Sequence, residues 1–187
     1  MLGRYHLSKN DEQGLKQAID YFERAVQIAP DYAAAYTGLS DAWQERGTSG
    51  TAGFKEVESP ARAAALKAVE LDEQLAEAHV SLSKIKQNYD WDWAGAEQEI
   101  RRALELDPGS LHVHTFYGCL LHLGRHDEAI REGEIAVQLD PVSSAGQSAL
   151  GRFLYRARRY REALPHLQRA VELGPRSATA YVRLGEL

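Results

Sequence analysis

The sequence predicts an all-α protein, a right-handed superhelix of antiparallel helix hairpins with about five repeats and partial repeats at both ends. Three series of residues recur with the same spacings of 43, 35, 33 and 34 positions. Two series are alanines and the third ends each segment: Ala18, Ala61, Ala96, Ala129, Ala163; Ala25, Ala68, Ala103, Ala136, Ala170; Pro30, Glu73, Pro108, Pro141, Pro175. Independent series that share one period near 34 indicate stacked helical repeats, because one hairpin cannot bury its own apolar face.

The helices follow in order from this pattern. A short first helix is expected at about 1–9, with its partner at about 13–28. Complete hairpins are expected at about 31–72, 75–107, 111–140 and 144–174, and a last helix starts near Ser177. The chain is therefore predicted to form a single array, 1–187, with a partial first repeat (1–30), complete repeats (31–74, 75–109, 110–142, 143–176) and the start of a further helix (177–187).

The residue types at the repeat positions explain the packing. Each proline stands just past a second helix, where it stops the helix and turns the chain. Gly118 and Gly151 allow two helices of a hairpin to approach closely. Leu2 and Tyr181 do not resemble a polar cap, so we expect either a piece of a longer protein or a dimer that forms end to end.

Two segments depart from the repeat. About nine extra residues lie within 47–60, where Gly, Ser and Thr predict a loop that leaves the stack. This loop is either a tolerated insertion or a lid that uses Phe54.

The second departure is the segment NYDWDWAG. Its aromatic side chains, Tyr89, Trp91 and Trp93, are expected to pack into the junction between helices. The alternative is an exposed aromatic binding site for a partner. Asp90 and Asp92 are expected to cap the following helix.

Composition limits the other function classes. The chain has 187 residues, a net charge of −5 and one cysteine, Cys119. The charge argues against a nucleic-acid partner, and a single cysteine excludes a disulfide framework or a multi-cysteine metal site. The sequence contains no apolar run of 18 residues and no signal peptide, so no membrane insertion is expected. The cytoplasm is the expected compartment, with an extracytoplasmic (periplasmic) part of a membrane-anchored regulator as the alternative.

The clearest repeat copy reads Gln147-x2-Leu150-Gly151-x2-Leu154, then Ala163-x3-Leu167-x2-Ala170, then Pro175. It resembles the tetratricopeptide repeat (TPR) signature, and the resemblance covers essentially the whole chain. This resemblance implies a TPR α-solenoid that acts as a protein-interaction scaffold. It implies a peptide or helix bound in the concave groove, with no catalytic residue and no cofactor.

A finer resemblance concerns Gly3–Leu7 and Asp90–Trp93 with the sequence around them. These segments resemble the C-terminal TPR arrays of large bacterial regulators of the cyclase, winged-helix activator or Ser/Thr kinase type. The resemblance implies that this chain is the partner-binding portion of such a signalling protein.

In TPR proteins the first helix of each hairpin lines the concave groove. The register then predicts the following groove residues: Asp41, Gln44, Lys84, Asn88, Thr115, Phe116, His122, Arg152, Tyr155, Arg156 and Arg183.

Charge varies along this predicted groove. Residues 1–93 hold 10 Lys and Arg against 15 Asp and Glu, whereas residues 94–187 hold 12 of each. Arg152 and Arg156 share a helix face beside Tyr155. This patch is either a solvated charged face or a site for an acidic or C-terminal carboxylate peptide, because arginine forks suit carboxylates. RNA or phospholipid is a further alternative.

One TPR binding mode is not expected. Gly38 and Ser81 occupy the positions of the asparagines in the carboxylate clamp that binds Hsp70 and Hsp90 C-terminal tails. His112 and Phe116 replace its basic pair. We therefore expect no recognition of those tails.

No pattern in the sequence predicts catalysis or a metal site. His79 and His114 fall at positions for a large packing residue, and the histidines are expected to be structural or surface residues, with no metal site. Cys119 has His122 one turn away but no third group that would orient the pair.

Overall fold

The computed structural model of the chain describes residues 2–7, 9, 11–175 and 178–185. These residues form helices joined by short turns, without a strand among them. They divide into two compact units, which we call the N-terminal unit (residues 1–106) and the C-terminal unit (residues 107–187). The predicted all-α class of antiparallel hairpins is confirmed, whereas a single continuous array over both units stays a prediction.

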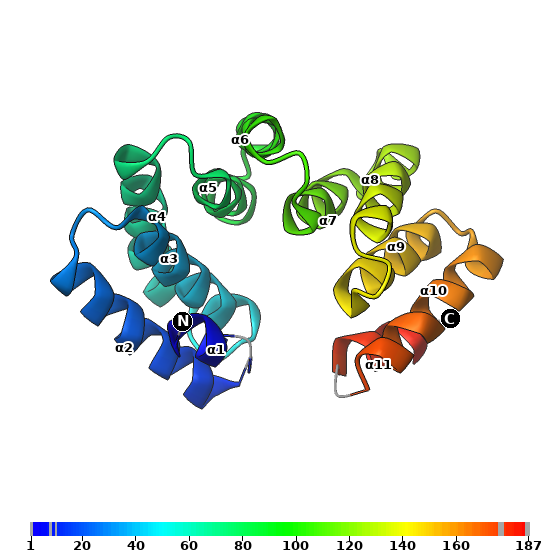
Figure 1. The fold of residues 1–187 in the computed structure, drawn as a ribbon, viewed down its shortest axis with the longest axis horizontal. Helices are drawn as coiled ribbons and strands as arrows, with labels where there is room; N and C mark the ends of the chain where they lie inside the picture. Colours follow the sequence, from blue (N-terminus) through cyan, green and yellow to red (C-terminus); the bar gives the residue numbers. More distant parts are fainter. Residues whose placement is uncertain (1, 8, 10, 176–177, 186–187) are drawn as a thin grey trace. The chain divides into compact units, whose positions relative to one another are not determined.

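The N-terminal unit contains three hairpins, in which consecutive helices pack in pairs (Figure 1). Its helices are α1 (Leu2–Leu7), α2 (Glu12–Ile28), α3 (Ala33–Thr48), α4 (Phe54–Leu71), α5 (Ala76–Asn88) and α6 (Trp93–Leu106). The first helices α3 and α5 also contact each other.

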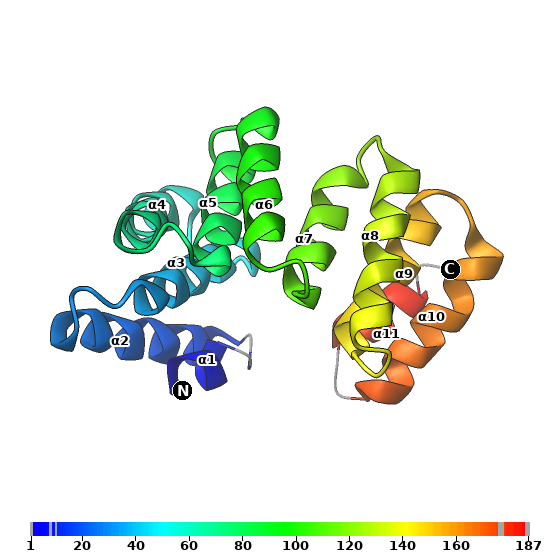
Figure 2. The ribbon, with the colours of Figure 1, turned by 45° about the horizontal axis from the view of Figure 1, so that its top comes forward.

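The C-terminal unit contains two hairpins and one further helix (Figure 2). Its helices are α7 (Leu111–Leu121), α8 (His126–Leu139), α9 (Ser144–Arg156), α10 (Tyr160–Leu173) and α11 (Ala178–Gly185). Helix α9 contacts both α7 and α11, so the first helices of successive repeats lie side by side.

Small residues at the helix crossings set the distance between helices. All five alanines of the first series are fully buried, as are four of the five in the second series. A Cβ atom on Gly151 would lie 2.6 Å from the Leu167 side chain, and one on Gly118 would lie 2.4 Å from the Phe153 ring. The predicted close approach at these two glycines is therefore confirmed.

The helix ends also follow the predicted pattern. Pro30, Pro108, Pro141 and Pro175 each stand two residues after the last residue of a second helix.

The prediction of a loop over 47–60 is wrong for most of that segment. Helix α3 continues to Thr48 and α4 begins at Phe54, so only 49–53 lies between them. The reason is packing, because Val57 is fully buried and lies 2.8 Å from the position of a Cβ on Gly47. The extra residues therefore lengthen this hairpin, even though Pro60 removes one backbone donor from α4.

The aromatic segment before α6 also differs from the prediction. Only Tyr89 packs inward, against Phe54 at 4.7 Å between ring centroids, whereas Trp91 is 71% exposed and Trp93 is 40% exposed. Asp92 caps α6 as expected, by accepting from the Gly95 N–H at 2.9 Å.

Asp90 is not a cap. It accepts two hydrogen bonds from the Arg62 guanidinium, at 2.6 and 2.8 Å, and this pairing lowers the pKa of Asp90. The backbone is thus held on both sides of Trp91. That residue adopts a left-handed conformation, with φ at 56°, and its side chain is exposed.

Buried histidines join the two helices of two hairpins. His79 contacts Glu99 Oε2 through Nδ1 at 2.7 Å and the Glu73 carbonyl through Nε2 at 3.1 Å. His114 has the same arrangement: its Nδ1 contacts Glu132 Oε2 at 2.6 Å, and its Nε2 contacts the Pro108 carbonyl at 3.0 Å. Both histidines are 7% exposed, which agrees with the packing role predicted for them.

A third hairpin uses an amide at the same position. Gln147 donates to the Pro141 carbonyl at 3.2 Å, and its Oε1 contacts His166 Nδ1 at 2.8 Å. Each group thus links a first helix to a second helix and to the carbonyl of the residue that ends the preceding repeat. We call these three groups the hairpin links.

Substitution of Gly118 by alanine should destabilise the C-terminal unit. The added Cβ would meet the fully buried Phe153 ring, and the overpacking is expected to cost about 1–3 kcal/mol. Thermal unfolding followed by circular dichroism measures the change. Gly124→Ala is the matched control, because its Cβ would meet nothing within 4 Å. Equal midpoints for the two variants would contradict the close-packing argument.

The link at His79 should make stability depend on pH. Its bond to Glu99 raises the pKa of His79 and lowers that of Glu99. The contribution of His79 is therefore complete below its unfolded pKa of about 6.5 and is lost as pH rises through the higher folded value. The limiting slope is about −1.4 kcal/mol per pH unit.

The measurement is the difference between the wild type and His79→Gln in unfolding free energy from pH 6 to pH 9. The difference isolates this group from His122 and His166, whose pKa values are lowered by burial. Glutamine is a suitable replacement because Gln147 holds the equivalent position. Parallel curves for the two proteins would show that His79 is not the titrating group.

Candidate interaction surface

Helices α7 and α9 bring together most of the predicted groove residues of the C-terminal unit. Side chains that are three or four residues apart share one face of a helix. Helix α7 carries Thr115, Phe116 and Cys119, and His122 follows as its C-terminal cap. Helix α9 carries Arg152, Tyr155 and Arg156.

Arg152 joins the two helices. Its guanidinium donates to Cys119 Sγ and lies 5.3 Å from the centroid of the Phe153 ring. The Cys119 carbonyl in turn accepts a hydrogen bond from Nδ1 of His122. The two helices therefore hold a guanidinium and an imidazole close to one another.

The electrostatic surroundings of His122 are cationic. Burial is the main cause that lowers its pKa, and the positive charges of Arg152, Arg156 and His126 lower it further. Only the hydrogen bond to the Cys119 carbonyl acts in the opposite direction. Among the described residues, no carboxylate acts on this imidazole.

Hydrogen-bonding capacity also remains unused here. Nε of Arg152 and Nδ1 of His126 are buried without a partner, and Arg156 is exposed without an ion pair among the described residues. We call His122, His126, Arg152 and Arg156 the basic α7/α9 surface. An anion would balance this positive charge and could pair with the exposed Arg156.

The remaining predicted residues of this unit have local partners. The Tyr155 ring contacts the Tyr160 ring in a tilted arrangement, at 5.4 Å between ring centroids, and Thr115 donates to the His112 carbonyl at 2.9 Å. Phe116 is half-buried. Arg183 lies in α11, but its side chain is outside the described part of the chain.

The predicted groove residues of the N-terminal unit are less available. Asp41 accepts hydrogen bonds from Ser81 at 3.1 Å and Lys84 at 3.2 Å, so two predicted groove charges neutralise each other between α3 and α5. Asn88, the last residue of α5, is exposed.

Gln44 requires a correction. It is only 3% exposed and donates to Ser40 at 3.0 Å, so it packs between helices and does not line a groove.

His126 belongs to the basic surface although it was not among the predicted groove residues. It stands four positions after His122, on the other side of the turn between α7 and α8. The spacing of these two histidines was the available signal. The partner of Arg152, by contrast, is 33 residues away in the sequence.

Within the described ranges, no group of three or more His, Cys, Asp or Glu side chains is placed to hold a metal ion. No helix in the described part of the chain has the length and apolar character needed to cross a membrane.

Family comparisons agree with the repeat geometry. Models described as tetratricopeptide repeat match residues 1–32 and 144–187. Small glutamine-rich tetratricopeptide repeat-containing protein 2 of Mycosarcoma maydis is 32% identical over 85 residues, which are 45% of this chain and 24% of the relative. Superkiller protein 3 of Schizosaccharomyces pombe is 28% identical over 183 residues, which are 92% of this chain and 12% of the relative. The matched part is thus a quarter or less of each relative.

Solved structures with this fold include TPR proteins. TTC0263, a thermophilic TPR protein of Thermus thermophilus, has a TM-score of 0.78 at 20% identity, covering 98% of this chain and 95% of that protein. YrrB, a TPR protein with an unusual peptide-binding site, has a TM-score of 0.59 at 19% identity, with coverages of 94% and 85%. The human IFIT1 dimer with m7Gppp-AAAA has a TM-score of 0.81 at 20% identity, with coverages of 98% and 44%.

The fold and the repeat define a helical-repeat scaffold of antiparallel hairpins. Residues 1–32 and 144–187 match tetratricopeptide repeat models, and the structural neighbours share the fold of this chain. A protein-interaction scaffold is the function that this fold supports, and the fold is typical of non-catalytic proteins.

The lack of clamp residues leads to a prediction about chaperone tails. A peptide that ends in EEVD should bind no more tightly than a scrambled peptide of the same composition, because Gly38 and Ser81 cannot hold its carboxylate. Fluorescence polarisation with both peptides measures this difference. A micromolar dissociation constant for the EEVD peptide, together with weak binding of the scrambled one, would contradict the prediction.

Proposed function

We propose that this chain is the partner-binding portion of a larger bacterial regulatory protein, and that it binds an acidic peptide or helix on the basic α7/α9 surface. The observation that carries the proposal is the unbalanced positive charge around His122. Arg152, Arg156 and His126 all act on this imidazole, and Arg156 is exposed without an ion pair among the described residues.

The position of the surface also supports a peptide partner. Its arginines lie on the first helix α9, which contacts the neighbouring first helix α7, and His122 and His126 flank the turn between α7 and α8. A guanidinium offers paired donors to a carboxylate, and the half-buried setting of Arg152 reduces screening by water. Tyr155 and Phe116 provide apolar contact area beside the charges.

An acidic protein suits this surface better than a nucleic acid. The chain carries a net charge of −5, so its overall field repels a polyanion, and the basic area is confined to a few side chains. A short acidic segment can contact these side chains without approaching the acidic remainder. The expected compartment is the cytoplasm, with an extracytoplasmic location as the alternative.

Self-association is the second candidate function. Leu2, Tyr5, Tyr181 and Val182 are between 51% and 59% exposed on α1 and α11. Apolar side chains on terminal helices favour contacts between copies. Light scattering that shows only monomer at high protein concentration would exclude this role.

The acidic-peptide proposal can be tested with a fluorescein-labelled hexaglutamate peptide. Replacement of both Arg152 and Arg156 by alanine should weaken its binding at least fivefold, because two charge-assisted contacts are lost. Fluorescence polarisation at low and physiological salt measures the affinities. Single-stranded RNA should not displace the peptide from the wild type.

The matched control replaces Arg131 and Arg161, two exposed arginines outside this surface, and should bind like the wild type. Capture of native partners by the wild type and both double variants extends the test to unknown proteins. Equal binding and equal recovery with all three proteins would reject the basic α7/α9 surface as the site.

A further inference from the structure

The C-terminal unit contains a pocket of about 350 Å³ that is lined by α8, α9 and α10. We call it the α8/α10 pocket, and its volume lies within the range of about 300–1,000 Å³ that is usual for ligand pockets. The apolar floor includes Leu150 and Leu154 of α9, which are both buried. The other lining residues stand on α8 and α10: Glu134, Val137, Gln138, Glu162 and His166. Both glutamates are exposed, so carboxylates border the apolar floor.

Two side chains of the N-terminal unit show what fills the equivalent space. Counted from the residue that ends the preceding repeat, Leu154 corresponds to Trp43 in α3 and to Lys86 in α5. Trp43 packs against two buried clusters, and Lys86 donates to Glu99 Oε1 at 2.7 Å. Glu99 corresponds to His166, because each stands three residues after an alanine of the first series. Leucine is shorter than tryptophan or lysine, so the α8/α10 pocket stays open where these two repeats hold an indole or a lysine stem.

The charges at the rim of the α8/α10 pocket favour a cation. Glu162 is held by the Arg159 guanidinium at 2.5 and 2.7 Å, whereas Glu134 makes no ion pair within the described residues. Two carboxylates thus stand near one guanidinium, which leaves a negative charge in excess. Glu134 also acts electrostatically on His166. A positively charged group beside Glu134 would balance the excess charge.

The imidazole of His166 offers a second acceptor. Gln147 uses its amide nitrogen to donate to the Pro141 carbonyl, so its Oε1 accepts a hydrogen bond from His166 Nδ1. Burial lowers the pKa of His166 below its ordinary value, so the ring is neutral at pH 7. In a neutral imidazole with a proton on Nδ1, Nε2 is an acceptor. An ammonium group, which carries three donors and no acceptor, suits a carboxylate and an imidazole nitrogen together.

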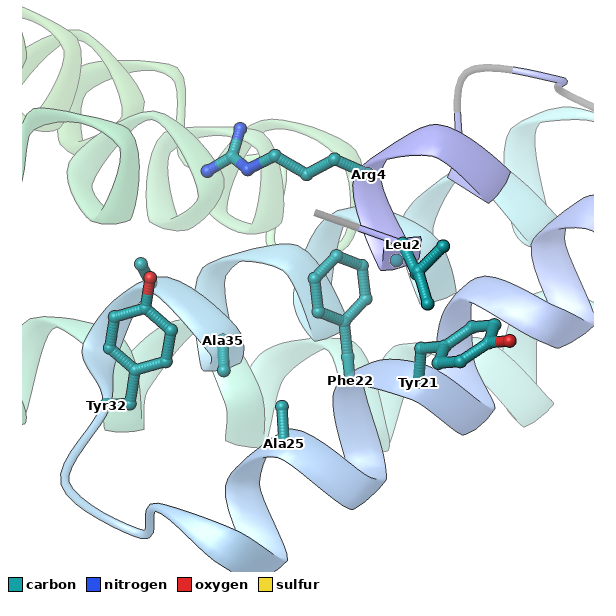
Figure 3. A pocket seen from close by; sticks show the side chains of 9 residues that line it. Leu2, Arg4, Tyr21, Phe22, Ala25, Tyr32 and Ala35 are labelled. Carbon is teal, nitrogen blue, oxygen red and sulfur yellow. The ribbon is translucent and has the colours of Figure 1, made fainter.

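Another pocket has the opposite charge. It has a volume of about 370 Å³ and is lined by residues of α1, α2 and α3 together with Tyr32. Figure 3 shows Phe22 and Tyr32 at this pocket, with the charged side chain of Arg4 extending across its mouth. Arg4 would repel a cationic ligand. A positively charged probe is therefore expected at the α8/α10 pocket and not here.

We propose that the α8/α10 pocket binds a lysine side chain of a partner protein. The aliphatic stem of that lysine lies against Val137 and Leu154, and its ammonium donates to Glu134 and to Nε2 of His166. The partner thereby supplies the group that Lys86 provides within the N-terminal unit. This site is independent of the basic α7/α9 surface, because it takes a ligand of the opposite charge.

The test uses fluorescein-labelled hexalysine in fluorescence polarisation at physiological salt, which screens long-range attraction to an acidic protein. The intact chain should bind this peptide. Glu134→Gln should weaken binding about fivefold, because it removes the unpaired carboxylate and keeps the shape of the side chain. Hexalysine with acetylated side-chain amines should bind the wild type about tenfold more weakly, because the ammonium groups are lost.

The matched control is Glu23→Gln, which should bind hexalysine like the wild type. Glu23 is exposed, and like Glu134 it stands two residues before an alanine of the second series. In its repeat the equivalent space is filled by Trp43. Equal binding by Glu134→Gln and Glu23→Gln, equal binding of the two peptides, or failure of the intact chain to bind hexalysine would overturn the proposal.

Two further measurements locate the peptide. Leu154→Lys should weaken binding about fivefold, because it places an ammonium where Lys86 stands in α5. Gln138→Lys, at an exposed lining position, replaces it if circular dichroism shows that Leu154→Lys is misfolded. In the wild type, hexalysine should shift the imidazole ¹⁵N signals of His166 and leave those of His79 unchanged. Unaltered His166 signals, or undiminished binding by the filled variant, would contradict the assignment.

Sedimentation of the wild type and Glu134→Gln at the same concentrations identifies the occupant. A wild-type dimer that Glu134→Gln abolishes would show that a lysine of a second copy fills the α8/α10 pocket, and would overturn the assignment to a partner protein. The same oligomeric state for both proteins, combined with the expected binding of hexalysine, would support it.

Discussion

The close approach of helices at small residues is the contact on which the rest of this structure depends. Where Gly118 and Gly151 face Phe153 and Leu167, a single methyl group would already overlap the neighbouring side chain. Close-packed interiors tolerate such additions poorly, so the spacing between helices is fixed by these crossings and by the buried alanines. That spacing positions neighbouring first helices, and hence the side chains of α7 and α9 that form the basic surface.

The hairpin links add a polar constraint to this apolar framework. His79, His114 and Gln147 each connect a first helix to a second helix and to a backbone carbonyl at the end of the preceding repeat. Their burial makes an unpaired nitrogen or oxygen costly, which favours one register of the hairpin over others. Both an imidazole and an amide can form this link, because each carries two hydrogen-bonding groups.

The basic α7/α9 surface arises because arginine and histidine side chains converge around His122. Burial and these neighbouring positive charges act on the imidazole in the same direction.

The sequence by itself determined the repeat, the helix order and the helix ends, because alanine, glycine and proline act through local backbone and packing rules that recur every 34 residues or so. It also indicated that Arg152, Tyr155 and Arg156 form a candidate binding patch, because they share one face of one helix.

Only the tertiary structure decided the contacts between helices. Gln44 is buried because it packs between helices. The buried side chain of Val57 holds part of the 47–60 segment in helix α4. The Arg62–Asp90 pair holds the backbone next to Trp91, whose side chain is exposed. His79 contacts Glu99, which is 20 positions away in the sequence. Arg152 contacts Cys119, which is 33 positions away. A repeat pattern specifies where such residues stand along the chain, but the identity of the partner across the hairpin depends on how each side chain packs.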